Sequence, residues 1–367
     1  MALLGRKASY LGIDLGASSL KIVELKNEGG RPKLVTYGFA EQRTDVVRSD
    51  SAEDQQRIVV ALKAILRKAR VSTNRLVAAL PSFAVFTSII SLPEMSKKDL
   101  FAAVRWEAKK FVPMPLEEMV LDWRLLQKQE SAEGNQLLAG SRKPNADSRP
   151  AGPKSMKVLL TAAPKNLVRR YIEIFRTCDL QIVSLETEAF ALQRSLIGAE
   201  PNPTMIVDIG AVATDVSVVV DGIPLINRSI DAGGDTITKA IANSLSVDPE
   251  RAEQFKRDFG IASTSGGVNE LPQAIDFVIS SIVNEIRYVL NLYRAQEERP
   301  IEKLILAGGS AFLPQLPEYL SKTLNMKVII GDAWARVIYP KELKVALDEI
   351  GPRFAVAIGL AMREIVG

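Results

Sequence analysis

The sequence predicts an α/β protein built from two similar halves. Residues 204–220 (TMIVDIGAVATDVSVVV) repeat the pattern of residues 10–25 (YLGIDLGASSLKIVEL). In this alignment Asp208 matches Asp14 and Gly210 matches Gly16, an offset of 194 residues (208 minus 14), about half of the 367-residue chain. Apolar strand-like runs also alternate with segments of helical periodicity. A repeat this long indicates a duplicated α/β domain and not a solenoid.

The composition narrows the function classes. The chain carries 47 Lys and Arg against 43 Asp and Glu, a net charge of +4, which gives no support to nucleic-acid binding. It has no histidine, which excludes Ser–His–Asp hydrolases, HExxH proteases and His-ligated zinc. Its single cysteine, Cys178, excludes an internal disulfide and a cysteine metal cluster, and is expected to fill apolar space in a helix over 171–179.

Two segments bear on membranes. The N-terminus has no long apolar region and no cleavage site, so we expect no secretory signal. Residues 76–93 run without a charge and approach the length of a spanning helix. Pro81 lies inside this run, and β-branched residues are frequent in it, which favours two strands joined at Pro81 and Ser82. We therefore expect no direct membrane insertion.

The elements of the first half follow from local patterns. Apolar runs on both sides of Gly16-Ala17-Ser18-Ser19 predict a strand, a tight turn and a second strand within 10–25. Further predicted elements are a strand over 33–39, an amphipathic helix over 54–70, and a helix from Ser96, capped with Asp99, that ends before Pro113. Polar residues 127–155 predict a flexible loop between strands at 119–126 and 157–163.

Three glycine turns could carry chemistry. The third, Ala307-Gly308-Gly309-Ser310, follows the apolar strand 303–306 and precedes a helix. A strand that ends in Asp and turns through Gly and small or hydroxyl residues points backbone N–H groups at phosphate, while its carboxylate can hold the water shell of Mg²⁺. Two such hairpins facing each other would clamp one nucleotide, and Lys21 adds a positive charge.

The order of these motifs resembles the actin-like ATPase superfamily. Asp14-Leu15-Gly16…Lys21, Asp208-Ile209-Gly210…Thr214 and 306–310 are similar to its phosphate-1, phosphate-2 and adenosine motifs. Residues 252–260 (AEQFKRDFG) resemble a helix of the cell-division protein FtsA and its relatives, and 230–235 (IDAGGD) resemble the glycine turn after phosphate 2. The resemblance implies a duplicated actin-like, ribonuclease H-like fold of two lobes, with a small α/β subdomain inserted in the first.

The resemblance also implies ATP and Mg²⁺ as cofactors. Asp14 and Asp208 would orient Mg²⁺ through water. The phosphate contacts would come from Gly16, Ala17, Ser18, Ser19, Lys21, Gly210, Ala211 and Thr214. The nucleoside would be surrounded by Gly233, Gly234, Glu253, Lys256, Gly308, Gly309 and Ser310. A water-positioning carboxylate is assigned to Glu186 or Glu188, and we expect at most slow ATP hydrolysis.

Within the superfamily the sequence is similar to the PilM proteins of type IV pilus machines. The similar segments are 104–118 (VRWEAKKFVPMPLEE), 160–165 (LTAAPK), 186–192 (ETEAFAL) and 284–287 (NEIR), and the likeness extends from about residue 9 to the end. It implies a cytoplasmic protein that associates with the inner membrane by binding the N-terminal tail of a PilN-like membrane protein. Pilus motor and platform proteins are further expected partners, and homo-oligomerisation stays open.

This resemblance implies four subdomains. Residues 1–84 with 166–195 would form the first actin-like subdomain, and 85–165 the inserted one, which would contribute to the peptide groove. Residues 196–232 with 300–367 would form the second actin-like subdomain, and 233–299 its smaller companion.

Three alternatives compete with the pilus interpretation. An FtsA-like filament protein would carry an amphipathic helix after a linker, whereas this sequence ends at 363–367 directly after the last predicted helix. A platform protein of a type II secretion system would share the same motifs. A sugar or acetate kinase of the superfamily would need an acceptor site with a positioned acid or base, and the sequence offers none.

Overall fold

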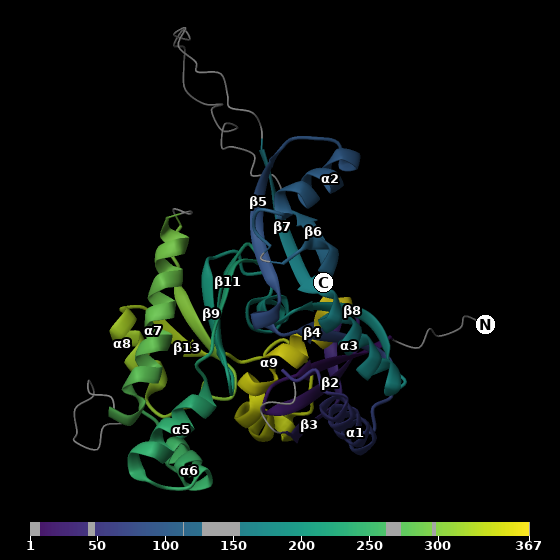
Figure 1. The fold of residues 1–367 in the computed structure, drawn as a ribbon. Helices are drawn as coiled ribbons and strands as arrows, with labels where there is room; N and C mark the ends of the chain where they lie inside the picture. The colour runs from purple at the N-terminus through teal and green to yellow at the C-terminus, as the bar shows by residue number, and fades with distance from the viewer. Residues whose placement is uncertain are drawn as a thin grey trace, which may run out of the picture. The chain divides into compact units, whose positions relative to one another are not determined.

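The computed structural model describes residues 8–42, 48–112, 114–126, 155–261, 273–295 and 299–366. The chain forms two compact units, one made of Met1–Ala84 and Val168–Gly367, the other of Val85–Leu167. We call them unit 1 and unit 2. Figure 1 shows the helices and strands of both.

Unit 1 begins with a five-stranded sheet in the order β3-β2-β1-β4-β8. Its strands are β1 (Ser9–Leu15), β2 (Ser19–Glu28), β3 (Arg31–Glu41), β4 (Arg75–Leu80) and β8 (Gln181–Thr187). The first three strands pair antiparallel, while β4 and β8 run parallel to β1. Helix α1 (Ala52–Lys68) covers this sheet, and its N-terminus is capped by Ser51, whose side chain accepts from the Asp54 N–H.

The second sheet of unit 1 repeats this topology in the order β11-β10-β9-β12-β13. Its strands are β9 (Thr204–Ile209), β10 (Thr214–Val220), β11 (Ile223–Ile230), β12 (Lys303–Ala307) and β13 (Lys327–Ile330). Again three strands pair antiparallel and the last two are parallel. The duplicated α/β fold is therefore confirmed, because both halves order their strands in the same way.

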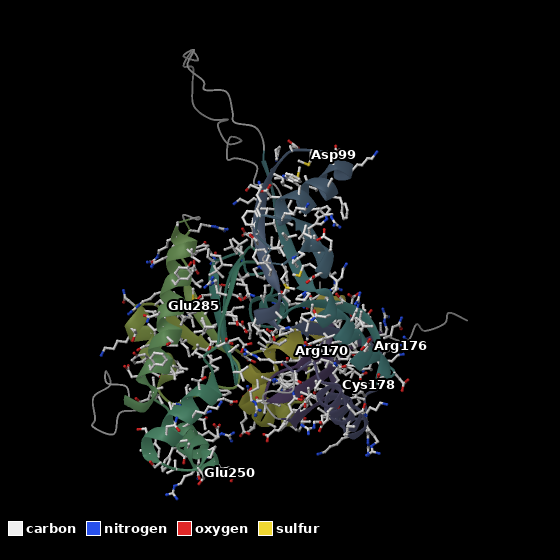
Figure 2. The ribbon with its side chains drawn as sticks, in the orientation of Figure 1. Asp99, Arg170, Arg176, Cys178, Glu250 and Glu285 are labelled. Atoms are coloured by element: carbon white, nitrogen blue, oxygen red, sulfur yellow. The ribbon has the colours of Figure 1, made fainter. Side chains whose placement is uncertain are left out.

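Helices complete unit 1. They are α3 (Lys165–Thr177, which starts in unit 2), α4 (Glu188–Leu192), α5 (Gly234–Leu245), α6 (Pro249–Phe259), α7 (Gln273–Arg294), α8 (Leu316–Leu324) and α9 (Lys344–Val366). Short turns of helix lie at Ser82–Ala84, Gln193–Ile197 and Lys341–Leu343. Glu250 on α6 and Glu285 on α7 locate the helices of the second half in Figure 2.

Helix α9 belongs with the first sheet. We expected 300–367 to pack with the second half, but α9 packs mainly against β1, β2 and α4. Gly12 makes this approach possible, because a Cβ there would lie 2.6 Å from the Ala361 backbone nitrogen. The core around α9 also takes Ile206 and Ile305 from the second sheet, so it joins both halves.

Unit 2 is a three-stranded antiparallel sheet with one helix. The strands β5 (Phe86–Pro93), β7 (Ser155–Pro164) and β6 (Met119–Leu125) lie in that order. Helix α2 (Lys97–Ala108) packs its buried residues on the sheet, and a short turn of helix spans Leu116–Glu118. The predicted strands on both sides of the polar loop are confirmed as the pair β6 and β7, and residues 127–154 of that loop lie outside the described residues.

Two smaller expectations concern Cys178 and residues 76–93. Helix α3 ends at Thr177, so Cys178 lies in the turn after it, where it is buried. Residues 76–93 contain β4, a turn at Pro81 and Ser82, and β5, so the two strands expected in place of a spanning helix are confirmed, and they lie in different sheets. Among the described residues no helix is both long and apolar enough to cross a membrane.

Candidate functional site

A cavity of about 690 Å³ lies in unit 1, lined by the three glycine turns. The turns follow β1, β9 and β12. Strands β1 and β9 are the corresponding first strands of the two repeats, so their turns correspond as well. Helices α5, α6 and α9 complete the wall. The volume is typical of a site for a nucleotide-sized ligand.

The first turn connects β1 to β2. Gly16, Ala17, Ser18 and Ser19 all line the cavity. Gln42 at the end of β3 holds this turn, because its side chain donates to the Gly16 carbonyl at 2.7 Å and its N–H to the Ser18 carbonyl at 3.0 Å.

The paired strand positions Asp14 and Lys21 also line the cavity. The Lys21 ammonium lies 2.9 Å from the Asp14 carboxylate, and both side chains are largely buried. Lys21, the residue opposite Asp14 in the strand pair, is therefore already paired with it.

The second turn connects β9 to β10 and is tied to the start of α5. The Gly210 and Ala211 carbonyls accept from the N–H groups of Gly234 and Asp235 at 2.9 and 2.8 Å. A Cβ on Gly233 would lie 2.5 Å from the Ala211 carbonyl oxygen, so only glycine permits this approach. The first turn of α5 is thereby fixed against the phosphate-2 turn.

The third turn touches the second. The Ser310 N–H donates to the Ile209 carbonyl at 3.2 Å, and the Gly308 N–H donates to Pro352 of α9 at 3.0 Å. Gly308 has a φ of +83°, a conformation that favours glycine. Gly309 has open space beside its Cα, with only the Arg353 side chain within 4 Å of a built Cβ, at 3.9 Å.

Four of the carboxylates that line the cavity form a cluster of interacting charges: Asp14, Glu188, Asp208 and Asp215. Burial, together with Asp14, raises the pKa of Glu188 to about 7. Burial, with Glu188 and Asp14 nearby, raises the pKa of Asp208 to about 7 as well. The pKa of Asp215 is raised well above its usual range, chiefly by burial. This cluster of carboxylates disfavours the binding of a phosphate alone and favours the binding of a phosphate together with a cation.

The structure separates the two candidate water-positioning carboxylates. Glu188 starts α4, lines the cavity, and accepts from the Ser82 hydroxyl at 2.6 Å and the Ser82 N–H at 2.9 Å. Glu186 does not line it: Arg194 binds both of its oxygens, at 2.8 and 3.0 Å, and Arg363 lies 3.4 Å away. The expectation for Glu186 is corrected, because its charge is used in a half-buried ion-pair network outside the cavity lining.

The FtsA-like helix is α6. Glu253 accepts from Thr238 at 2.6 Å and pairs with Lys256 at 2.5 Å. Burial acts to raise the pKa of Glu253, but hydrogen bonds from Lys256 and Thr238 outweigh it, and the pKa is lowered. Lys256 is buried and also donates to the Gly234 carbonyl at 3.1 Å, so it locks α6 to the start of α5 while it lines the cavity.

Most of the expected residues gather at this cavity, with three exceptions. Glu186 is one. Thr214 is fully buried and donates to the Ala232 carbonyl at 2.6 Å, and Gly233 packs beneath the second turn. Neither is among the lining residues.

Sequence reasoning missed several lining residues. Asp215 occupies the position of Lys21 in the repeat, so the 194-residue offset could have found it. Arg48, Phe312 and Arg353 also line the cavity, and no local pattern marks them. The Arg48 guanidinium stacks on Phe83 at 4.5 Å and pairs with Asp231 of the other half at 2.6 Å.

The residues present fit a magnesium nucleotide. Two buried oxygens without hydrogen-bond partners, Ser19 Oγ and Asp215 Oδ1, belong to residues that line the cavity. Among the described residues no three His, Cys, Asp or Glu side chains gather closely enough to bind a metal ion by themselves. A Mg²⁺ ion here would therefore take phosphate and water oxygens as ligands, as it commonly does at phosphate sites.

Known proteins resemble the chain over its whole length. The family model described as type IV pilus assembly protein PilM matches residues 12–152 and 148–365. The solved structure titled "PilM-PilN type IV pilus biogenesis complex" contains a chain of the same fold, with a TM-score of 0.80 and 28% identity, covering 98% of this chain and 99% of that one.

Two further relatives are more distant. The ethanolamine utilization protein EutJ from Carboxydothermus hydrogenoformans aligns with a TM-score of 0.55 and 16% identity over 98% of this chain and 90% of its own, which supports the fold alone. The cell division protein FtsA of Neisseria meningitidis is 28% identical over 176 residues, 42% of this chain and 41% of FtsA. The match thus spans less than half of that curated relative. With these neighbours, the actin-like fold predicted from the glycine turns is confirmed.

Proposed function

Because this chain belongs to the family of the type IV pilus assembly protein PilM, we propose that it is a cytoplasmic, nucleotide-binding component of a pilus assembly platform. It binds Mg·ATP in the cavity of unit 1 and binds the N-terminal tail of a PilN-like membrane protein. That peptide holds it at the inner membrane. Nucleotide occupancy then biases the relative position of its two halves and so couples to assembly.

The observation that carries the nucleotide proposal is the convergence of three glycine turns on one cavity. The turns after β1 and β9 come from the duplicated hairpins, and a pair of backbone turns of this kind can bind phosphates from two sides. The third turn, with Gly309 open beside it, leaves room for the nucleoside. Phe312 on the same turn offers a ring to a base.

The cluster of four carboxylates in the cavity supports the magnesium proposal. Asp14 and Asp208 would accept hydrogen bonds from water bound to the ion, and Asp215, another lining carboxylate, would add negative charge beside it. Mg²⁺, when bound, would supply positive charge to the phosphate oxygens. Lys21 would exchange its pairing with Asp14 for a phosphate oxygen.

Any hydrolysis by this site would be slow. Glu188 would orient the water, but the hydroxyl and the N–H of Ser82 both donate to one of its two oxygens. Its raised pKa leaves it partly protonated near neutral pH. The proposed role is therefore nucleotide-dependent binding and not rapid turnover.

Calorimetric titration of ATP with and without Mg²⁺ tests the nucleotide proposal. Asp14→Ala, and the isosteric Asp14→Asn, should abolish magnesium-dependent binding while circular dichroism shows an intact fold. Asp258→Ala is the matched control, because Asp258 is exposed and lies outside the cavity lining. Unchanged affinity in both Asp14 variants would exclude the magnesium role.

The partner proposal rests on the family and on the solved PilM-PilN complex, at 28% identity. Unit 2 is expected to contribute to the peptide site. A filament-forming, FtsA-like activity or a role in a type II secretion platform would give a different outcome. Sedimentation of filaments with Mg·ATP tests the first, and the identity of the neighbouring PilN-like gene tests the second.

A further inference from the structure

Helix α2 in unit 2 has one buried and one exposed face. Leu100, Val104 and Ala108 pack on the β5-β7-β6 sheet. The 100° turn per residue places Lys98, Arg105, Trp106 and Lys109 within about 100° of one another on the opposite side. We call these four residues the α2 outer face. All are exposed, and Asp99 marks the start of the helix in Figure 2.

The α2 outer face combines an aromatic ring with basic side chains. Trp106 is 68% exposed, although tryptophan is normally highly buried, and Phe101 on the same helix is 58% exposed. The Lys109 ammonium lies 5.7 Å from the centre of the Trp106 ring. Phe111 and Met114, which follow the helix in the sequence, are both at least 40% exposed.

The acidic residues of α2 already have local partners. Ser96 donates to Asp99 at 2.7 Å, as part of the N-terminal cap, and Lys110 pairs with Glu107 at 2.9 Å. No ion pair of Lys98, Arg105 or Lys109 is present among the described residues. The hydrogen bond from Ser96 leaves the charge of Asp99 in place, but Lys98, Arg105 and Lys109 outnumber it, so this side of α2 carries net positive charge around an exposed indole.

We infer that the α2 outer face adsorbs to an anionic phospholipid surface. Indole rings favour the boundary between headgroups and acyl chains, where one edge is wet and the other apolar. Lys and Arg stems lie along the apolar layer while their charges stay with the phosphates. A single exposed helix face can lie directly on a flat lipid surface, whereas an acidic protein would need a groove that matches it.

This adsorption goes beyond the proposed function and needs neither nucleotide nor peptide. It would add a second, weak contact to a membrane that the protein otherwise reaches through a partner. Two weak contacts to one surface bind much more tightly than either alone.

Co-sedimentation of the full chain with vesicles tests the inference. The probes are phosphatidylcholine vesicles with and without about 30 mol% phosphatidylglycerol. We expect binding only to the anionic vesicles, weakened by salt, and reduced about tenfold or more in Arg105→Glu/Lys109→Glu. The matched control is Lys63→Glu/Arg67→Glu, an exposed i,i+4 basic pair on α1 that changes the net charge equally and should bind as wild type.

Tryptophan fluorescence gives an independent readout. The chain has three tryptophans. Trp334 is fully buried and Trp123 is half-buried against the core of unit 2, so a blue shift on adding anionic vesicles reports mainly on Trp106. Trp106→Phe should remove the shift. The inference would be overturned if the wild type did not sediment with anionic vesicles, or if the two double variants lost vesicle binding equally. An acidic protein would then be the remaining partner. Nucleotide affinity, measured on the same proteins, separates this outcome from failure of the proposed function.

Discussion

Gly308 and Gly309 are adjacent, yet the structure predicts opposite consequences for a single methyl group. A Cβ on Gly308 would lie 2.7 Å from the Ile209 carbonyl carbon and closer still to the Ile209 oxygen and the Asp208 carboxylate. Its φ of +83° costs an L-residue about 1–2 kcal/mol, and displacing fixed backbone adds about 1–3 kcal/mol. Gly308→Ala should therefore lower the free energy of unfolding by about 2–5 kcal/mol.

Gly309→Ala is the matched comparison. Its Cβ would meet only Arg353, at 3.9 Å, so we expect a stability change within about 0.5 kcal/mol. The methyl group would point into space assigned to the nucleoside, and ATP affinity should fall. Urea denaturation of nucleotide-free protein measures the first effect, and calorimetry measures the second. Equal stability of the two variants would refute the geometry assigned to this turn.

Two further predictions concern the charged groups of the cavity. The pKa values of Glu188 and Asp208, raised to about 7, mean that the folded state binds more protons than the unfolded state between pH 4 and 7. The unfolding free energy of the nucleotide-free protein should therefore fall as pH rises through this window, by up to about 1.4 kcal/mol per pH unit for each proton involved, and level off above it. Denaturation curves from pH 5 to 8 check this, and stability that rises over the same range would contradict it. The Arg48–Asp231 pair joins the two halves beside the cavity, so Arg48→Ala should speed nucleotide dissociation, followed by stopped flow, while costing less than about 1 kcal/mol of stability because the pair is exposed. An unchanged dissociation rate would show that the Arg48–Asp231 pair does not retain the nucleotide.

The fold was predictable because its signals are local and repeated. The two hairpins have the same Asp-x-Gly pattern, and apolar alternation on each side marks their strands. The packing of α9 was not predictable, because an apolar helix does not reveal which sheet it covers. Gly12, which admits α9 to β1, lies more than 300 residues away in the chain.

The site residues that lie in the three glycine turns were predictable, because the sequence motif itself forms each turn. The choice between Glu186 and Glu188 was not, because residues two apart share a face only while a strand continues. Here β8 ends at Thr187 and α4 begins at Glu188, so the chain turns between the two carboxylates. Arg48 reaches the cavity from a distant loop, and only the folded chain brings it there.

The most direct test of the account is a calorimetric titration of the Mg·ATP-loaded protein with a peptide of the N-terminal tail of its PilN-like partner. The partner is sought in the neighbouring reading frame. Binding at micromolar concentration or tighter, lost when residues 85–165 are deleted and the rest is shown to be folded, is the predicted result. Absence of binding to folded, nucleotide-loaded protein would contradict the adaptor role and leave only an actin-like nucleotide-binding protein.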